Sequence, residues 1–186
     1  MFKQSNVTYN GETFKLEGSG IQKKETRAKD LAGYFSDSTA YQALDPETVM
    51  YQVEFQDNGL AEGTAGGLYF GITHLYSGVI GEEYYLTKGH FHAKRDTGEY
   101  YFGLQGQGLL MMTENGETVL EEVVPGSVHY IPGNAAHRLI NTGAEMLSVS
   151  ACWQTESGHD YVPPEEMFPQ RVFRDKAGKP IIKNNS

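Results

Sequence analysis

Residues 89–99 read Gly-His-Phe-His-Ala-Lys-Arg-Asp-Thr-Gly-Glu, the most informative stretch of this 186-residue chain. If residues 90–92 are extended, their side chains alternate between two faces, so His90 and His92 point to the same side. The Asp-Thr-Gly at residues 96–98 predicts a turn, after which the carboxylate of Glu99 can return to the same pocket. Two imidazoles and a carboxylate on one face make a poor apolar core, so we interpret them as the start of a metal site.

A third imidazole follows later in the chain. His137 comes after a predicted turn at residues 132–136 and can reach the pocket from a neighbouring strand. Three nitrogens and one oxygen suit a divalent Fe, Mn, Ni, Co or Zn ion, and the sequence does not choose among them. The alternative for His90 and His92 is a solvated strand face that binds no metal. His74 and His129 lie inside predicted strands, and we interpret both as structural or surface histidines.

Short β-rich runs separated by glycine and turn residues extend from this segment towards both ends of the chain. Asn10-Gly11 lies between two such runs and predicts a hairpin. Residues 22–34 instead carry a short, helix-like spacing of apolar positions. The pattern indicates an all-β sandwich or jelly roll with a few short helical segments, and not a parallel βαβ sheet. The predicted strands are 7–9, 13–16, 49–55, 68–75, 84–86, 100–104, 108–113, 118–124, 128–131, 138–140 and 146–153, with 171–173 and 180–182 as possible edge strands.

The composition excludes several classes of partner. A net charge of −9 gives no basic field for nucleic acid or for an anionic membrane, so we predict neither. Lys88, Lys94 and Arg95 form a small basic cluster that is either solvated surface or attracts an anionic substrate. Cys152 is the only cysteine, which excludes an internal disulfide, and we expect a buried, inert thiol. Residues 1–6 lack a signal-peptide core and no apolar run is long enough to span a bilayer, so we expect a cytoplasmic protein.

The metal-site candidates fall into a wider pattern that resembles the two sequence motifs of the cupin family. The gap before Glu99 is longer than in most cupins, Asn134 stands where a glycine is usual, and Tyr84 stands where a glycine usually opens the first motif. The resemblance implies a cupin jelly-roll barrel. The matching positions are His90, His92, Glu99 and Gly106 in the first motif, and Gly126, Pro132, His137 and Asn141 in the second.

A closer resemblance is to the cupin-type glucose-6-phosphate isomerases. Residues 85–94 look like that family's signature, the longer gap to Glu99 also matches it, and residues 158–161 add a further match. The similarity covers roughly residues 45–165, and it implies one cupin domain over residues 1–186 with its metal-binding core at about 45–165. It also implies interconversion of glucose 6-phosphate and fructose 6-phosphate, and a homodimer whose N-terminal strands cross to the partner.

The same resemblance assigns roles to individual residues. It implies that one divalent ion per subunit, with Fe²⁺ as first choice, is held by His90, His92, Glu99 and His137. It implies that the sugar phosphate meets Thr73, Thr87, the Gly89 amide and Tyr161. Glu99, Tyr101 and His159 are the implied catalytic residues, the last two lying close to the reacting end of the sugar. Trp153 stands where the family often has Tyr, which changes the reach of one phosphate contact.

Two other functions fit a histidine-rich cupin. A non-haem iron dioxygenase would use a similar site, but it would require an O₂ site and would not require phosphate donors such as Thr73 and Thr87. A non-catalytic sugar-binding cupin, such as a sensor, usually carries a second, DNA-binding domain, for which 186 residues leave no room. The sequence also leaves open whether an isomerase here would use an enediol or a hydride shift.

Overall fold

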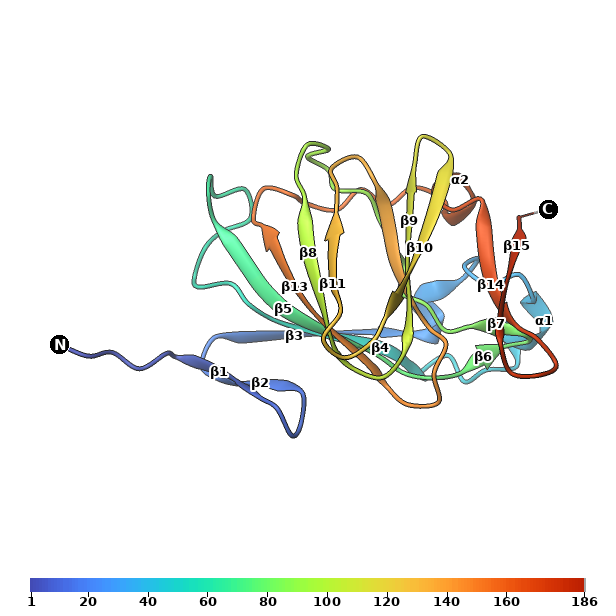
Figure 1. The fold of residues 1–186 in the computed structure, drawn as a ribbon, viewed down its shortest axis with the longest axis horizontal. Coiled ribbons are helices and arrows are strands. Elements are labelled where there is room, and N and C mark those ends of the chain that lie inside the picture. The colour runs from blue at the N-terminus through green and yellow to red at the C-terminus, as the bar shows by residue number, and fades with distance from the viewer. Residues whose placement is uncertain (186) are drawn as a thin grey trace.

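The computed structural model describes residues 1–185, and Figure 1 shows a chain built almost entirely from antiparallel strands. The strands are β1 (Val7–Asn10), β2 (Lys15–Gly18), β3 (Ile21–Arg27), β4 (Val49–Gln56), β5 (Leu68–Leu75), β6 (Val79–Ile80), β7 (Glu83–Tyr84), β8 (Glu99–Gln105), β9 (Gly108–Glu114), β10 (Glu117–Val123), β11 (Val128–Ile131), β12 (Ala136–Asn141), β13 (Leu147–Gln154), β14 (Gln170–Arg174) and β15 (Pro180–Asn184). The helical segments are a 3₁₀ turn at Ala28–Leu31, α1 (Ser38–Gln42) and α2 (Pro164–Met167).

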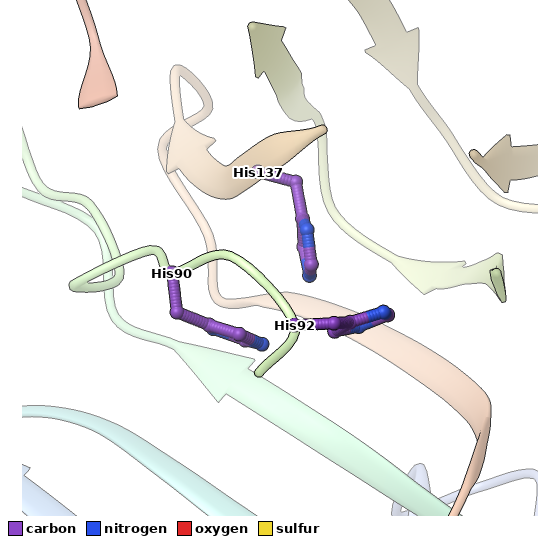
Figure 2. A group of neighbouring side chains, drawn as sticks. All are labelled: His90, His92 and His137. Carbon is purple, nitrogen blue, oxygen red and sulfur yellow. The ribbon is translucent and has the colours of Figure 1, made fainter. Parts of the chain in front are cut away.

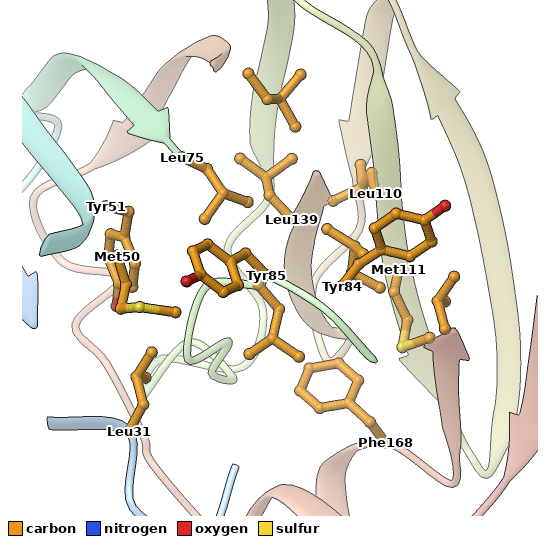
Figure 3. Packing of buried hydrophobic residues seen from close by; sticks show 14 of the residues in the cluster. Leu31, Met50, Tyr51, Leu75, Tyr84, Tyr85, Leu110, Met111, Leu139 and Phe168 are labelled. Carbon is orange, nitrogen blue, oxygen red and sulfur yellow. The ribbon is translucent and has the colours of Figure 1, made fainter. Parts of the chain in front are cut away.

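Two sheets enclose the core. The larger has six strands in the order β11-β8-β13-β5-β4-β3, and the smaller has three in the order β10-β9-β12. Leu75 of β5 and Leu110 of β9 come from different sheets and belong to one buried cluster, which Figure 3 shows at close range. Because side chains alternate along each strand, every second residue of these sheets faces this interior and the others face outwards. The all-β fold class with short helical segments is confirmed.

The predicted strands agree with the structure along most of the chain. The predictions for 68–75 and 128–131 match β5 and β11 residue for residue, and most of the others differ by one or two residues at an end. The segment predicted at 84–86 is shorter, because β7 ends at Tyr84 and Leu86 makes only an isolated bridge to Ile140. The hairpin at Asn10 is confirmed, but its turn spans residues 11–14, with the side-chain oxygen of Asn10 accepting from the Glu12 and Thr13 amides.

The helix-like reading of residues 22–34 is wrong over its first half. Residues Ile21–Arg27 form β3, which pairs with β4 along its length at the edge of the six-stranded sheet. Only the 3₁₀ turn that follows β3 is helical, and there the apolar residues Ala28 and Leu31 are buried. Pairing with an exposed strand edge therefore outweighs a weak local helical pattern.

The C-terminal segment covers the outside of β12. α2 leads into the β14–β15 hairpin, and this hairpin pairs with β7 in a four-stranded sheet, β15-β14-β7-β6. The strands expected at 171–173 and 180–182 are thus confirmed, but only β15 lies at an edge, because β14 pairs on both sides. Within residues 1–185 no helix has the length and apolar character needed to cross a membrane.

Candidate functional site

Three histidines, His90 and His92 from the loop after β7 and His137 from β12, come together (Figure 2). His90 and His137 form an antiparallel bridge, with backbone N–O distances of 3.2 and 3.1 Å in the two directions. His92 lies two residues on, and one ligand nitrogen from each of the three rings lies within 4.8 Å of the others. Residues 90–92 are therefore extended, as expected. They form isolated bridges and are not part of a longer strand.

Glu99 joins this cluster from the first position of β8. Its Oε2 atom lies 3.2 Å from His92 Nε2 and 3.3 Å from His137 Nε2, and the side chain is buried. Burial alone would raise the pKa of the Glu99 carboxyl, but His137 and His92 outweigh burial and hold the pKa below its usual value. The group is therefore a carboxylate at neutral pH.

The donor atoms suit a divalent metal ion. The Thr97 carbonyl lies 2.8 Å from His92 Nδ1 and the Ala135 carbonyl 3.3 Å from His137 Nδ1, so each Nδ1 has a carbonyl acceptor and each Nε2, which faces Glu99, is the atom that would ligate a metal. His137 Nε2 is buried and has no hydrogen-bond partner within residues 1–185. Burial and the neighbouring histidines hold the pKa of His90 well below 6.5, which keeps that ring in its neutral, ligating form. The cluster can therefore hold a metal.

A cavity of about 130 Å³ opens over the cluster and brings together every candidate residue from the sequence. Its lining combines the four metal-ligand candidates with side chains from β5, β8, β13 and the loops that follow β7 and β13. The sequence-predicted residues among them are Thr73, Thr87, Gly89, His90, His92, Glu99, Tyr101, His137, His159 and Tyr161.

The loop after β7 fixes two of the phosphate candidates, Thr87 through the backbone of β12 and Gly89 through its conformation and close packing. The Thr87 amide donates to Leu139 O at 2.9 Å, and the Leu139 amide donates to Thr87 Oγ1 at 3.0 Å, so the Thr87 hydroxyl proton is free for a ligand. Gly89 has φ = +70°, and a Cβ there would lie 2.7 Å from the Phe168 ring. Only glycine suits this position, because both the backbone conformation and the close approach exclude a side chain.

The two remaining catalytic candidates lie on different sides of the histidines. Burial, with the nearby Glu99 charge, raises the pKa of Tyr101 well above 10, so its hydroxyl remains protonated. The Tyr101 and His137 rings are 6.0 Å apart, edge to face. His159 lies at the cavity mouth with its ring 4.4 Å from His90 and stacked on Tyr161 at 5.8 Å. Partial desolvation at this mouth lowers the pKa of His159, which favours the neutral ring at pH 7.

The structure separates the small basic cluster into two kinds of residue. Lys94 pairs with Glu156 at 3.1 Å, and Arg95 pairs with Asp160, so both are structural. Lys88 instead lines the cavity. Tyr51 also lines it, and burial raises the pKa of Tyr51 to about 12. The sequence reasoning missed Tyr51, although its position in strand 49–55 on the same face as Val53 was a usable signal.

The other histidines and the cysteine lie outside the cavity, as expected. His74 contacts Ser148 Oγ at 2.9 Å, and His129 contacts Glu121 Oε2 at 2.6 Å. Cys152 is half-buried, less enclosed than expected, because it lies on the outward face of β13. Partial burial raises the pKa of this thiol, which leaves it protonated.

Comparison with known proteins agrees with this geometry. The family profile described as "Glucose-6-phosphate isomerase (GPI)" matches residues 25–168. This chain belongs to that family. A glucose-6-phosphate isomerase of Thermococcus kodakarensis is 38% identical over 168 residues, covering 89% of this chain and 87% of the relative. The Pyrococcus furiosus glucose-6-phosphate isomerase is 35% identical over 189 residues, covering 99% and 97%.

The solved structures with a partial likeness are more distant from this chain. Oxalate decarboxylase from Bacillus subtilis aligns with a TM-score of 0.47 and 17% identity over 61% of this chain and 27% of its own. Oxalate oxidase in complex with glycolate aligns with a TM-score of 0.46 and 15% identity over 77% and 56%. The chain thus spans about a quarter of the first of these proteins and about half of the second. Its all-β fold is a cupin fold.

Proposed function

We propose that this chain is a metal-dependent aldose–ketose isomerase that interconverts glucose 6-phosphate and fructose 6-phosphate. The observation that supports this most is one cavity lined both by a His₃Glu cluster and by the hydroxyls and glycine amide expected to meet a phosphate. Membership of the glucose-6-phosphate isomerase family supports the same substrate class. The activity belongs to glycolysis and gluconeogenesis, and we place it in the cytoplasm.

His90, His92, Glu99 and His137 would hold one divalent ion per subunit, with Fe²⁺ as our first choice. Bound there, the ion would act as a Lewis acid towards the oxygens at the reacting end of the sugar. The Thr97 carbonyl orients the His92 ring and the Ala135 carbonyl orients the His137 ring, so that each Nε2 atom faces the proposed ion.

Glu99 is our candidate base, because it is ionised and buried beside the reacting end of the cavity. In the enediol route its carboxylate removes the proton from C2 of glucose 6-phosphate and returns it to C1, while a hydroxyl proton passes from O2 to O1. Tyr101, protonated at all physiological pH values, donates a hydrogen bond that orients the substrate or relays this proton. In the competing route a hydride moves from C2 to C1, and Glu99 is a ligand or a shuttle for the hydroxyl protons.

The sugar must open before either route. His159 is neutral and lies at the cavity mouth beside His90, where it can accept the O1 proton and return it to the ring oxygen. For the phosphoryl group we propose Thr73, Thr87, the Gly89 amide and Tyr161 as donors. Thr87 is suited to this because its hydroxyl oxygen accepts from the Leu139 amide, which leaves the hydroxyl proton to donate to the phosphoryl group.

We also propose that the chain is a homodimer, with the N-terminal strands crossing to the partner. The outward face of the six-stranded sheet supports this, because it exposes large apolar side chains on three strands: Leu68, Phe70, Tyr100, Phe102, Val128 and Tyr130. Register places Val128 opposite Phe102 and Tyr130 opposite Tyr100, so the exposed residues of β8 and β11 form adjacent rows. Exposed apolar area of this kind is typical of protein interfaces.

The test is turnover by the metal-reconstituted protein of glucose 6-phosphate, fructose 6-phosphate and mannose 6-phosphate, with an O₂ electrode in the same vessel. We expect isomerisation of the first two without O₂ consumption. O₂ consumption coupled to loss of substrate would indicate a dioxygenase. Saturable sugar-phosphate binding without turnover would indicate a binding protein, and either result would overturn the proposal.

A further inference from the structure

A second and larger cavity, of about 670 Å³, adjoins the first on the β3 side of the six-stranded sheet. We call it the outer groove. The two cavities share Tyr51, Val53, Trp153, Gly158, His159 and Tyr161, so they are continuous across the mouth at His159. A sugar phosphate entering from this side therefore passes through the outer groove before it reaches the metal-ligand cluster.

Lys24 of β3 is the cation that faces this path. Register places Lys24 opposite Val53 of β4, and Val53 opposite Thr73 of β5. The three residues thus form one row across neighbouring strands, and this row ends at a phosphate candidate of the inner cavity. Lys23 also borders the groove, but its ammonium lies 3.4 Å from the buried Glu54 carboxylate, opposite which Lys23 is placed by register.

The Lys24 ammonium is available to a ligand. It has no carboxylate oxygen within 4.0 Å among residues 1–185, in contrast to Lys23, Lys29 and Lys94. Its Nζ atom lies 5.4 Å from the centre of the Phe55 ring, within the range of a cation–π contact. This contact holds the ammonium over the groove without neutralising its charge.

Aromatic rings form the wall beside Lys24. The Phe55 and Trp153 rings are 6.1 Å apart, and Tyr69 meets Trp153 edge-on at 5.7 Å. Trp153 is thereby packed towards the outer groove while it still lines the inner cavity. Of the two lysines that line the outer groove, Lys24 is the one whose ammonium has no carboxylate partner among residues 1–185, so it can serve as the charged donor beside these rings.

The charges around the outer groove indicate what it can bind. The chain carries a net charge of −9, and Asp57 and Glu62 line the same groove, so a doubly charged phosphoryl group needs a local cation to enter. A flexible ammonium suits transient capture better than a rigid guanidinium fork does. We propose that the outer groove is an entry subsite for the phosphoryl group of the sugar phosphate, with Lys24 as its cation. This inference rests on the proposed function.

The kinetic test compares Lys24→Gln with Lys176→Gln in the metal-loaded protein. Lys176 is exposed in the turn between β14 and β15, and its substitution makes the same change in net charge far from the groove. For Lys24→Gln we expect kcat/KM for fructose 6-phosphate to fall roughly tenfold at low salt, through KM, and the difference to shrink in high salt. Lys24→Arg should restore most of the loss, and Lys176→Gln should behave as the wild type does.

A binding test does not depend on turnover. Trp153 is the only tryptophan beside 12 tyrosines, so fluorescence excited selectively at tryptophan reports on the side chain that lines both cavities. Titration with inorganic phosphate should change this fluorescence in the wild type and in Lys176→Gln, with an affinity at least threefold weaker in Lys24→Gln. Equal phosphate affinity and equal kcat/KM in Lys24→Gln and the wild type would overturn the inference. A chain with no isomerase activity that still shows the Lys24-dependent titration would overturn only the proposed function.

Discussion

The Glu99 carboxylate lies 3.2 Å from His92 Nε2 and 3.3 Å from His137 Nε2, and in that place it can be a metal ligand, a base or both. Glu99→Gln keeps the size and one potential oxygen ligand but removes basicity. If Glu99 is the base, the variant should retain most of its metal while kcat falls by roughly 10²–10⁴. Bound metal and turnover are measured on the same sample.

The contrary outcomes for this variant are distinct. Loss of activity that follows metal occupancy and is rescued by excess metal would make Glu99 a ligand only. A kcat near that of the wild type with metal bound would remove it from the catalytic residues. Solvent deuterium adds a second readout, because an enediol route allows some deuterium into C2 of the sugar and a hydride shift allows none by that step.

At this scale the sequence predicted that the metal-ligand candidates lie together, and it did not predict the outer groove. His90 and His92 share a face by alternation, and the turn before Glu99 is visible in its residues, so local rules suffice. Lys24 could not be found in this way. Its place in one row with Val53 and Thr73 depends on the register of β3, a strand that the local pattern presented as helical.

Among the elements, the β1–β2 hairpin is attached to the outer face of the large sheet through a buried polar cluster. Glu54 accepts from the Leu16 amide at 2.6 Å, and its Oε1 lies 3.4 Å from His74 Nε2. Burial, helped by Lys15 and Lys23, lowers the pKa of His74, and Glu54 only partly offsets this. His74 is therefore neutral in the folded chain at pH 7.

This cluster should make stability depend on pH. The unfolded chain binds a proton at His74 more readily than the folded chain does. The stability that neutral His74 allows is therefore complete above about pH 6.5, the pKa of histidine in the unfolded chain. It is lost as pH falls towards the lowered pKa of His74 in the folded chain. We expect the free energy of unfolding to fall from pH 7.5 to 5. In His74→Gln the slope of this fall should be shallower than in the wild type, by at most about 1.4 kcal/mol per pH unit. Denaturant titrations check this, and identical slopes would contradict it.

The segment that carries α2 supports the loop of the site from behind. Phe168 is fully buried, the Arg138 guanidinium lies 4.1 Å from its ring centre, and the same ring packs against Gly89. Phe168→Ala should destabilise the chain by about 3–5 kcal/mol, because it opens a cavity. It should also raise KM, because the Gly89 amide loses its support. The half-buried Phe173 of β14 is the control, and a Phe173→Ala effect as large as that of Phe168→Ala would contradict the account.

Most of the elements were predictable because turn residues delimit short strands. The interior strands β5, β9 and β13 have both apolar pattern and boundaries in the sequence. The exceptions depend on distant partners. Residues 21–27 form a strand because they pair with the edge of β4. Residues 85–92 form isolated bridges to β12 and to Asp160. The local pattern of one sequence does not show which distant strand or residue a segment will pair with.

For the whole molecule, the exposed apolar rows predict assembly. We expect light scattering to give a dimer at micromolar concentration, and Tyr100→Glu combined with Phe102→Glu to give a monomer, because both side chains lie on the exposed face of β8. Val119→Glu is a matched control on β10 of the other sheet, where an equally exposed apolar residue should be dispensable. A stable wild-type monomer would contradict the proposed dimer.

Metal dependence of isomerisation is the central claim, and one measurement addresses it directly. Bound metal, by elemental analysis, and turnover of fructose 6-phosphate are determined on the same samples of wild type and His92→Ala, before and after EDTA. Because the ligand candidates include no thiolate, we predict that chelation removes the ion and abolishes activity, that Fe²⁺ or Mn²⁺ restores both, and that His92→Ala loses metal affinity. Full activity in protein verified to be free of metal, or no turnover in protein verified to be loaded, would contradict the account.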